Sequence, residues 1–148
     1  LIPWSRWITP RLGTLTRKRF DTRFFIAAAP PDQVARHDDI EATHSLWISA
    51  RAALLAQHQR RIELAPPQVM SLVHLSRYAS VAEALHAAGA RAPVLIEPAV
   101  FDQAGVRLLC YPGDPLHPVP ERALPGPTRL RFIDQGFEAE GGFDALFA

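Results

Sequence analysis

The sequence predicts a β-rich domain that also contains helices, because strand-like segments near both ends flank helix-like segments. Near both ends, apolar and polar residues alternate with a period of two, which is typical of β-strands. Between these parts, apolar residues recur at helical spacing after serine and proline residues that favour helix starts. A length of 148 residues fits one domain, which we expect to span residues 1–148.

The most strongly patterned strand lies within Arg19–Pro30. One parity of this segment predicts the buried face of a central strand and holds Phe20, Thr22, Phe24 and Ile26. The other parity carries Asp21 and Arg23, one pleat apart. These two side chains either form a structural ion pair or face a polar ligand, and the pattern leaves both readings open.

Two further segments before residue 62 have clear signals. Leu1–Ile8 predicts a strand with an edge position or an irregular start, because Pro3 lacks an amide donor. Glu41–Ile48 predicts a strand that leads directly into a helix, which Ser49 caps and which ends near Arg61.

The remaining elements follow from proline, capping and turn signals. Ser80 and Glu83 have the spacing of a capping box, and Asp102–Gly105 has the composition of a hairpin turn. The predicted elements are, in order, a helix from Pro67, a helix over Val81–Ala88, a hairpin of Val94–Val100 with Val106–Tyr111, a rigid proline-rich loop over Pro112–Pro127, a strand over Thr128–Ile133 and a weakly specified tail over Gly141–Ala148.

The composition excludes several classes of protein. A hydrophobic content of 48% and a charged content of 21% are ordinary for a globular protein, and a net charge of +1 does not steer it to nucleic acid or a membrane. No apolar run is long enough to span a bilayer, so we expect a cytoplasmic protein. The 15 arginines against one lysine suggest the coding bias of a GC-rich bacterium.

Local motifs alone do not define a reaction. No histidine or cysteine spacing predicts a metal site, and Cys110 lies in an apolar strand where an inert core thiol is expected. The run Arg17–Arg19 is either a solvated loop or a phosphate contact. Asp114 in the loop Gly113–Pro118 is expected to stabilise a turn, with a site as the alternative. For Glu41, the interpretation without a functional role is a solvated strand end.

The order of four segments nevertheless resembles the C-terminal half of a Nudix hydrolase, in the branch of the coenzyme A diphosphatases. The segments are W-I-T-P, R-F-D-T-R-F-F-I-A, E-A-T-H-S-L-W-I-S-A-R-A-A-L and I-E-L-A-P-P-Q, and together they cover about Leu1–Tyr78. The resemblance implies an α+β fold, namely a partial αβα Nudix sandwich with a mixed β-sheet that lacks its N-terminal strands and the Nudix-box helix. Residues 79–148 would then form a C-terminal helix and a β extension.

The family's chemistry resides in the Nudix box, G-x5-E-x7-R-E-U-x-E-E-x-G-U, whose glutamates hold Mg²⁺ or Mn²⁺. No segment of this sequence matches that pattern. Because the chain begins at Leu1 without a methionine, we expect the box upstream of Leu1. The resemblance implies that the parent protein cleaves the diphosphate linkage of a nucleoside diphosphate derivative, such as coenzyme A or acyl-CoA, and that this chain alone is inactive.

The resemblance carries three residues over to the site. Arg23 and Asp21 would lie near the cleft for a small-molecule diphosphate substrate, and Glu41 would position the metal or the attacking water. One alternative is a non-catalytic ligand-binding or interaction domain on a Nudix-like scaffold. Another is an unrelated β-rich domain, for which the resemblance would be accidental.

Overall fold

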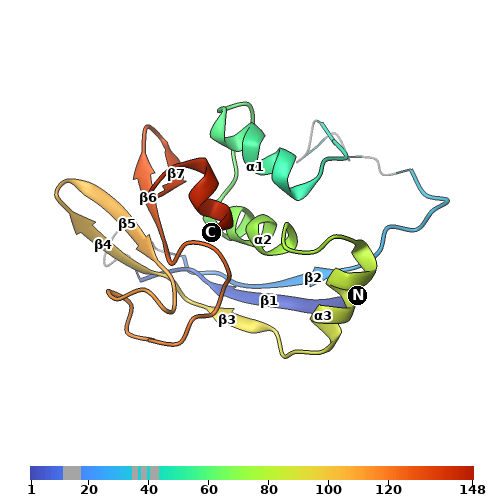
Figure 1. Ribbon diagram of the computed structural model, residues 1–148, viewed down its shortest axis with the longest axis horizontal. Helices are drawn as coiled ribbons and strands as arrows, with labels where there is room; N and C mark the ends of the chain where they lie inside the picture. Colours follow the sequence, from blue (N-terminus) through green and yellow to red (C-terminus); the bar gives the residue numbers. More distant parts are fainter. Residues whose placement is uncertain (12–17, 35–36, 38–39, 41–43) are drawn as a thin grey trace.

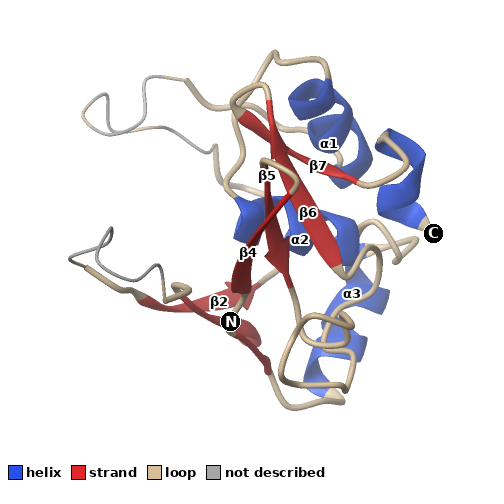
Figure 2. Ribbon diagram, turned by 90° about the vertical axis from the view of Figure 1, so that its left-hand side faces the viewer, coloured by secondary structure: helices blue, strands red, loops and turns tan. Residues whose placement is uncertain are grey.

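The computed structural model describes residues 1–11, 18–34, 37, 40 and 44–148. Within these residues the chain forms three α-helices, a 3-10 helix and two β-sheets (Figure 1). The three-stranded sheet runs along one side of the molecule, and the four-stranded sheet rises from one end of it (Figure 2). The mixture of helices and separate sheets confirms the predicted α+β class.

The first sheet has β1 (Ile2–Ile8) at its centre and not at its edge, with the strand order β2-β1-β3. The second strand, β2 (Asp21–Ile26), pairs antiparallel with β1, and β3 (Val94–Ile96) pairs parallel with it, so the sheet is mixed. Of the two alternatives predicted for β1, the edge position does not hold, and the prediction of a central position for β2 is wrong. Periodicity reports which face is apolar but not how many neighbours a strand has.

The irregular start predicted for β1 is confirmed by a shift of register between Pro3 and Ser5. Pro3 pairs with Phe25 and Ser5 pairs with Phe24, so Trp4 is the extra residue of a bulge. A bulge reverses the side-chain alternation at one point. Trp4 and Trp7 can thus both be buried although they lie three residues apart.

The apolar parity of β2 is only half-buried, which corrects the prediction of a buried face. Phe24 and Ile26 are half-buried, Thr22 is exposed, and Phe20 precedes the strand with 65% of its surface exposed. The reason is the edge position, because an edge strand has a neighbour on one side only.

The three helices confirm the predicted starts. In α1 (Ala50–His58), Oγ of Ser49 accepts a hydrogen bond from the amide of Ala52 at 3.3 Å, although the helix ends at His58 before the predicted Arg61. The next helix, α2 (Pro66–Leu75), has prolines in its first turn. In α3 (Val81–Gly89), Oγ of Ser80 accepts from the amide of Glu83 at 3.2 Å.

The segment before α1 differs from the prediction. Residues 44–48 form no strand, and Trp47, which we expected on a strand, is 76% exposed. Residues 41–43, the start of the predicted strand Glu41–Ile48, lie outside the described residues. Alternation alone does not make a strand where no neighbour supplies hydrogen bonds.

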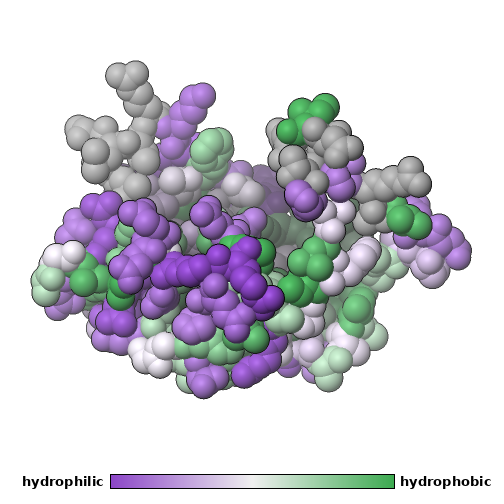
Figure 3. All heavy atoms as spheres, turned by 90° about the horizontal axis from the view of Figure 1, so that it is seen from above, coloured by the Kyte–Doolittle hydropathy of each residue, from purple (hydrophilic) through white to green (hydrophobic). Residues whose placement is uncertain are grey.

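Seen from above, the molecule is largely hydrophilic toward the left, and hydrophobic patches gather toward the right (Figure 3).

The second sheet is an antiparallel meander with the order β4-β5-β6-β7. Its strands are β4 (Ala99–Gln103), β5 (Val106–Cys110), β6 (Arg129–Ile133) and β7 (Gly136–Ala139). The predicted hairpin is confirmed as β4-β5, but its first half is divided, because the chain leaves the first sheet after β3 and enters the second at β4. Two elements were not predicted: β7, which lies between the predicted strand Thr128–Ile133 and the predicted tail, and the 3-10 helix Phe143–Phe147 within the tail.

A shared hydrophobic core joins the two sheets and the helices. Its buried members come from both sheets, α1 and α2, and include Trp7, Leu54, Met70, Ile96 and Leu130. Within the described part of the chain, none of the helices is long and apolar enough to cross a membrane.

Candidate functional site

An apolar cavity of about 410 Å³ lies where the two sheets meet. This volume is within the usual range for small-molecule pockets. The lining combines the end of β1, one face of β2, the start of α2 and the second sheet: Trp7, Ile8, Thr9, Pro10, Thr22, Phe24, Pro66, Pro67, Pro98, Val100, Arg107, Leu109, Phe132 and Phe137.

One wall of the cavity is built from the N-terminal half of the chain. Strand alternation directs Thr22 and Phe24 of β2 to the cavity, beside Trp7 of β1, which is the cross-strand partner of Thr22. Trp7 is held in place because its indole N–H donates to Oγ of Ser5 at 3.1 Å and its ring meets Tyr111 edge-on at 5.9 Å.

The other wall comes from the second sheet. Phe132 and Phe137 face each other across the β6-β7 hairpin with ring centroids 5.1 Å apart. Arg107 is the charged residue of the lining, and its Nε lies 3.1 Å from a carboxylate oxygen of Asp102. The wall therefore offers a ligand aromatic and aliphatic surface, with one cation already paired.

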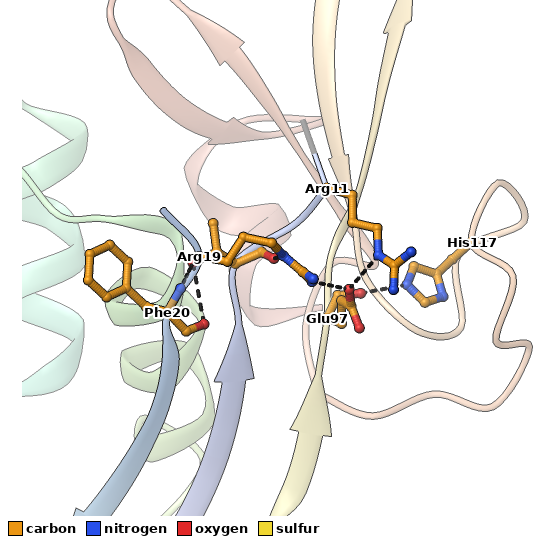
Figure 4. Close-up of polar contacts among 6 residues, drawn as sticks. Arg11, Arg19, Phe20, Glu97 and His117 are labelled. Atoms are coloured by element: carbon orange, nitrogen blue, oxygen red, sulfur yellow. Dashed lines mark hydrogen bonds and ion pairs between the residues drawn. The ribbon is translucent and has the colours of Figure 1, made fainter. Parts of the chain in front are cut away.

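A polar cluster lies beside the cavity at the end of β3 (Figure 4). The carboxylate of Glu97 accepts from Nη2 of Arg19 at 2.5 Å, and Nε of Arg11 lies 3.8 Å from the same oxygen. Nε of Arg19 also donates to the carbonyl oxygen of Thr9 at 3.0 Å. One carboxylate thus faces two guanidinium groups, and this cluster keeps a net positive charge.

His117 completes the cluster in a neutral tautomer that its partners define (Figure 4). Its Nδ1 accepts from the amide of Val119 at 3.0 Å, so Nε2 carries the proton and donates to the carbonyl oxygen of Glu97 at 2.9 Å. This arrangement makes His117 a brace between the proline-rich loop and the end of β3.

Asp21 and Arg23 lie on the opposite face of β2 from the cavity. Asp21 does not pair with Arg23 as considered above. Instead, Nε and Nη2 of Arg6 donate to its two carboxylate oxygens at 2.8 and 2.6 Å. Hydrogen bonding from Arg6 lowers the pKa of Asp21. Arg23 is exposed beside Arg6, its cross-strand partner, so two guanidinium groups and one carboxylate share this face.

The described residues offer no site for a divalent metal. Among them, no group of three or more histidine, cysteine, aspartate or glutamate side chains is placed to hold an ion. Glu41, the residue predicted to position metal or water, lies outside the described residues, as does Arg17 of the basic run. The carboxylates of Asp21 and Glu97 are both engaged by arginines, which a cation would have to displace.

Two other predicted candidates are structural. Asp114 is buried, and its carboxylate accepts hydrogen bonds from the amide of Leu116 at 2.9 Å, from Thr128 at 3.0 Å and from Arg129 at 2.7 Å, which confirms the predicted turn. Cys110 is buried, and burial raises the pKa of its thiol to about 11, so it stays protonated and inert as predicted.

Comparison with known proteins decides the family. The family model of the NUDT19 Nudix domain matches residues 1–75, half of the chain. The chain belongs to the NUDT19 Nudix domain family. The matched region supplies β1, β2, α1, α2 and the N-terminal wall of the cavity, and it confirms the resemblance to a Nudix hydrolase of the coenzyme A diphosphatase branch.

Three curated relatives carry the name acyl-coenzyme A diphosphatase NUDT19. The Xenopus laevis protein is 32% identical over 81 residues, which are 54% of this chain and 21% of that protein. The human protein is 34% identical over 80 residues (54% and 21%), and the Gallus gallus protein is 31% identical over 123 residues (78% and 32%). The chain thus spans between a fifth and a third of these relatives.

These relatives are vertebrate proteins, which contradicts the bacterial origin suggested by the arginine bias. A bias toward arginine and alanine reflects base composition, which is not a property of bacteria alone. No solved structure matches the chain.

Proposed function

We propose that this member of the NUDT19 Nudix domain family is part of a hydrolase that cleaves the diphosphate linkage of coenzyme A or an acyl-CoA. The observation that carries the proposal is the family match over residues 1–75, together with relatives named as acyl-coenzyme A diphosphatases. The substrate would be a small anionic molecule with an apolar portion, and the chain offers both kinds of surface at one end of the first sheet.

Two surfaces support this assignment. The apolar cavity has Ile8 and Thr22 in its lining. The second surface is the opposite face of the strand pair, which holds Arg6, Asp21 and Arg23. It begins at Asp21, the cross-strand partner of Ile8. Arg23 on that face is exposed and is proposed to contact the phosphates, whereas Asp21 would orient Arg6 through its two hydrogen bonds.

The proposal includes Mg²⁺ or Mn²⁺, for which the described residues provide no ligand cluster. Its ligands would be the glutamates of a Nudix box, which is absent from these 148 residues, with Glu41 as a supporting carboxylate. No catalytic step is assigned to the described residues, and their part is to bind and orient the substrate.

The first prediction is that the 148-residue chain alone does not hydrolyse coenzyme A, because it lacks the box glutamates. The chain is incubated with coenzyme A and Mg²⁺ or Mn²⁺, and release of phosphopantetheine is followed by chromatography. A longer protein that carries a Nudix box should release it. Turnover by the short chain that Glu41→Gln abolishes would contradict the prediction. Binding without turnover in the box-containing protein would favour the non-catalytic alternative.

The second prediction concerns Arg23 in the box-containing protein. Arg23→Ala should raise KM for coenzyme A about tenfold or more, because a hydrogen bond to a charged group contributes about 1.5–3 kcal/mol. The melting temperature should not change, since Arg23 is exposed. Arg61→Ala, at an exposed arginine beyond α1, is the matched control and should leave KM unchanged. A lower melting temperature with an unchanged KM would make Arg23 a structural residue.

A further inference from the structure

The chemistry of the cavity restricts its ligand to an apolar group. Its walls are aliphatic, proline and aromatic side chains, and the polar side chains of the lining are Thr9, Thr22 and Arg107. The guanidinium of Arg107 already donates to Asp102. A polar ligand would lose its bonds to water in this cavity and find few partners, whereas a hydrocarbon chain loses nothing.

A cationic groove adjoins the cavity. Pro98 and Val100 line both the cavity and a neighbouring groove that also contains Arg11, Glu97 and His117. Glu97, which lines that groove, pairs with Arg11 of the same lining and with Arg19 beside it, so one positive charge is in excess. The combination of an apolar cavity and a cationic mouth fits an amphipathic anion.

We propose that the cavity is the binding site for the acyl chain of an acyl-CoA, and that the anionic portion leaves the cavity past Arg11 and continues toward Arg23. This inference rests on the proposed function, and it adds an assignment for the acyl chain within that substrate. The ω end of the chain packs between Trp7 and the Phe132–Phe137 pair, which come from opposite walls. The thioester lies toward Pro98, where the cavity meets the groove.

The geometry makes affinity depend on chain length. Each methylene that enters an apolar site should tighten binding about fourfold. A cavity of about 410 Å³ accommodates only a limited length, so the gain should stop once the cavity is full. Short acyl groups should therefore bind little better than coenzyme A itself.

The test measures dissociation constants by calorimetry, with chelator present so that no metal-dependent hydrolysis occurs. The probes are coenzyme A and saturated acyl-CoAs from acetyl to lauroyl, below their micellar concentrations. We expect affinity to rise with chain length and then level off. Equal affinities across the series would overturn the proposal.

Thr22 provides the blocking variant, because it is exposed on β2 and its side chain lines the cavity. Thr22→Trp places an indole in the cavity at a strand position where tryptophan is well tolerated. It should weaken lauroyl-CoA binding at least about tenfold, which is the loss expected when roughly two methylenes no longer fit in the cavity. Binding of coenzyme A should not change. Thr22→Val has the same shape as threonine and should keep the full dependence on chain length.

A third variant examines the cationic mouth. Arg11 is 82% exposed and pairs with Glu97 at a distance of 3.8 Å, so Arg11→Gln should not disturb folding. It should weaken all CoA ligands by a similar factor and reduce the salt dependence of binding. The dependence on chain length should remain.

Two results would overturn the assignment. One is an unchanged chain-length dependence in Thr22→Trp. The other is a dimer that Thr22→Trp dissociates and that acyl chains do not, because a second copy would then be the occupant. Hydrolysis of coenzyme A, which has no acyl chain, by the box-containing protein tests the proposed function separately. That activity without any chain-length dependence of binding would refute the cavity assignment and leave the proposed function intact.

Discussion

Asp114→Ala is expected to lower the free energy of unfolding by about 3 kcal/mol at neutral pH, the lower end of the range for breaking a buried ion pair. Asp114 is 2% exposed and accepts hydrogen bonds from Arg129, Thr128 and the amide of Leu116. Its removal leaves these donors without a partner in the protein. The guanidinium of Arg129 is partly exposed and recovers some hydration, which limits the loss.

The same carboxylate predicts a dependence on pH. Burial alone would raise the pKa of Asp114, but the hydrogen bonds from Arg129, Leu116 and Thr128 outweigh it and lower the pKa below its usual value. Because the folded-state pKa lies below the unfolded value, the stabilisation is fully present above about pH 4. It is lost as the pH falls through the folded-state pKa. Urea unfolding should therefore show a difference between wild type and variant that shrinks in acid.

A matched control separates this buried pair from an exposed one. The pair of Arg107 with Asp102 has a similar Nε–carboxylate distance, 3.1 Å, but both side chains are about half exposed or more. Asp102→Ala should cost about 0–1 kcal/mol, as is usual for surface ion pairs. Equal losses for the two aspartate variants would show that Asp114 does not anchor its loop.

Gly126→Ala is the second substitution with a large expected effect, a loss of about 2–5 kcal/mol. Gly126 has φ of +83°, and an added Cβ would lie 2.6 Å from Cγ1 of Val73 and 2.9 Å from the carbonyl oxygen of Leu146. The left-handed conformation costs about 1–2 kcal/mol for alanine, and overpacking adds about 1–3 kcal/mol. The clash would force the loop away from α2, which carries Val73.

Gly105 supplies the control for the conformational part of that cost. It has φ of +79° in the β4-β5 turn, and an added Cβ would meet nothing within 4 Å. Gly105→Ala should therefore cost about 1–2 kcal/mol, the strain alone. Thermal or urea unfolding of both variants gives the packing part by difference. A difference near zero would mean that the loop yields without loss.

Local chemistry explains why the helices and the first hairpin were predictable. Ser49 and Ser80 cap helices through bonds that span only three residues, and the turn before Val106 forms within one hairpin. Such interactions are encoded by neighbours in the sequence. The strand signals at Leu1–Ile8 and Thr128–Ile133 succeeded for the same reason.

The failures have a common physical cause, which is that partners distant in sequence decide them. Whether β1 is central or at an edge depends on its pairing with β3, which begins more than eighty residues after β1 ends. The segment before Trp47 alternates like a strand, yet residues 44–48 form none. Strand β7 forms because the chain turns back after β6 at Asp134 and Gln135. Both residues have positive φ angles, which are uncommon for residues other than glycine and which no sequence pattern predicted here.

The candidate site was only partly predictable. The motif residues at Trp7–Pro10 and Pro66–Pro67 were noted as family marks, and both line the cavity. Their meeting with Val100 and the Phe132–Phe137 pair depends on how two sheets pack, which no local pattern encodes. Arg6, the partner of Asp21, was also missed. Its place on the polar parity of β1 could have suggested it, had the antiparallel register been known.

Two residues connect the sheets that form the cavity, Glu97 and Pro98, and they occupy the position of a hinge. The proline ring fixes one torsion, Arg19 holds the Glu97 carboxylate, and His117 holds its carbonyl. These contacts restrain the connection between the two walls of the cavity. A protein prepared in this way loses little conformational entropy on association. Differences in affinity between ligands should therefore reside mainly in residence times and only weakly in rates of capture.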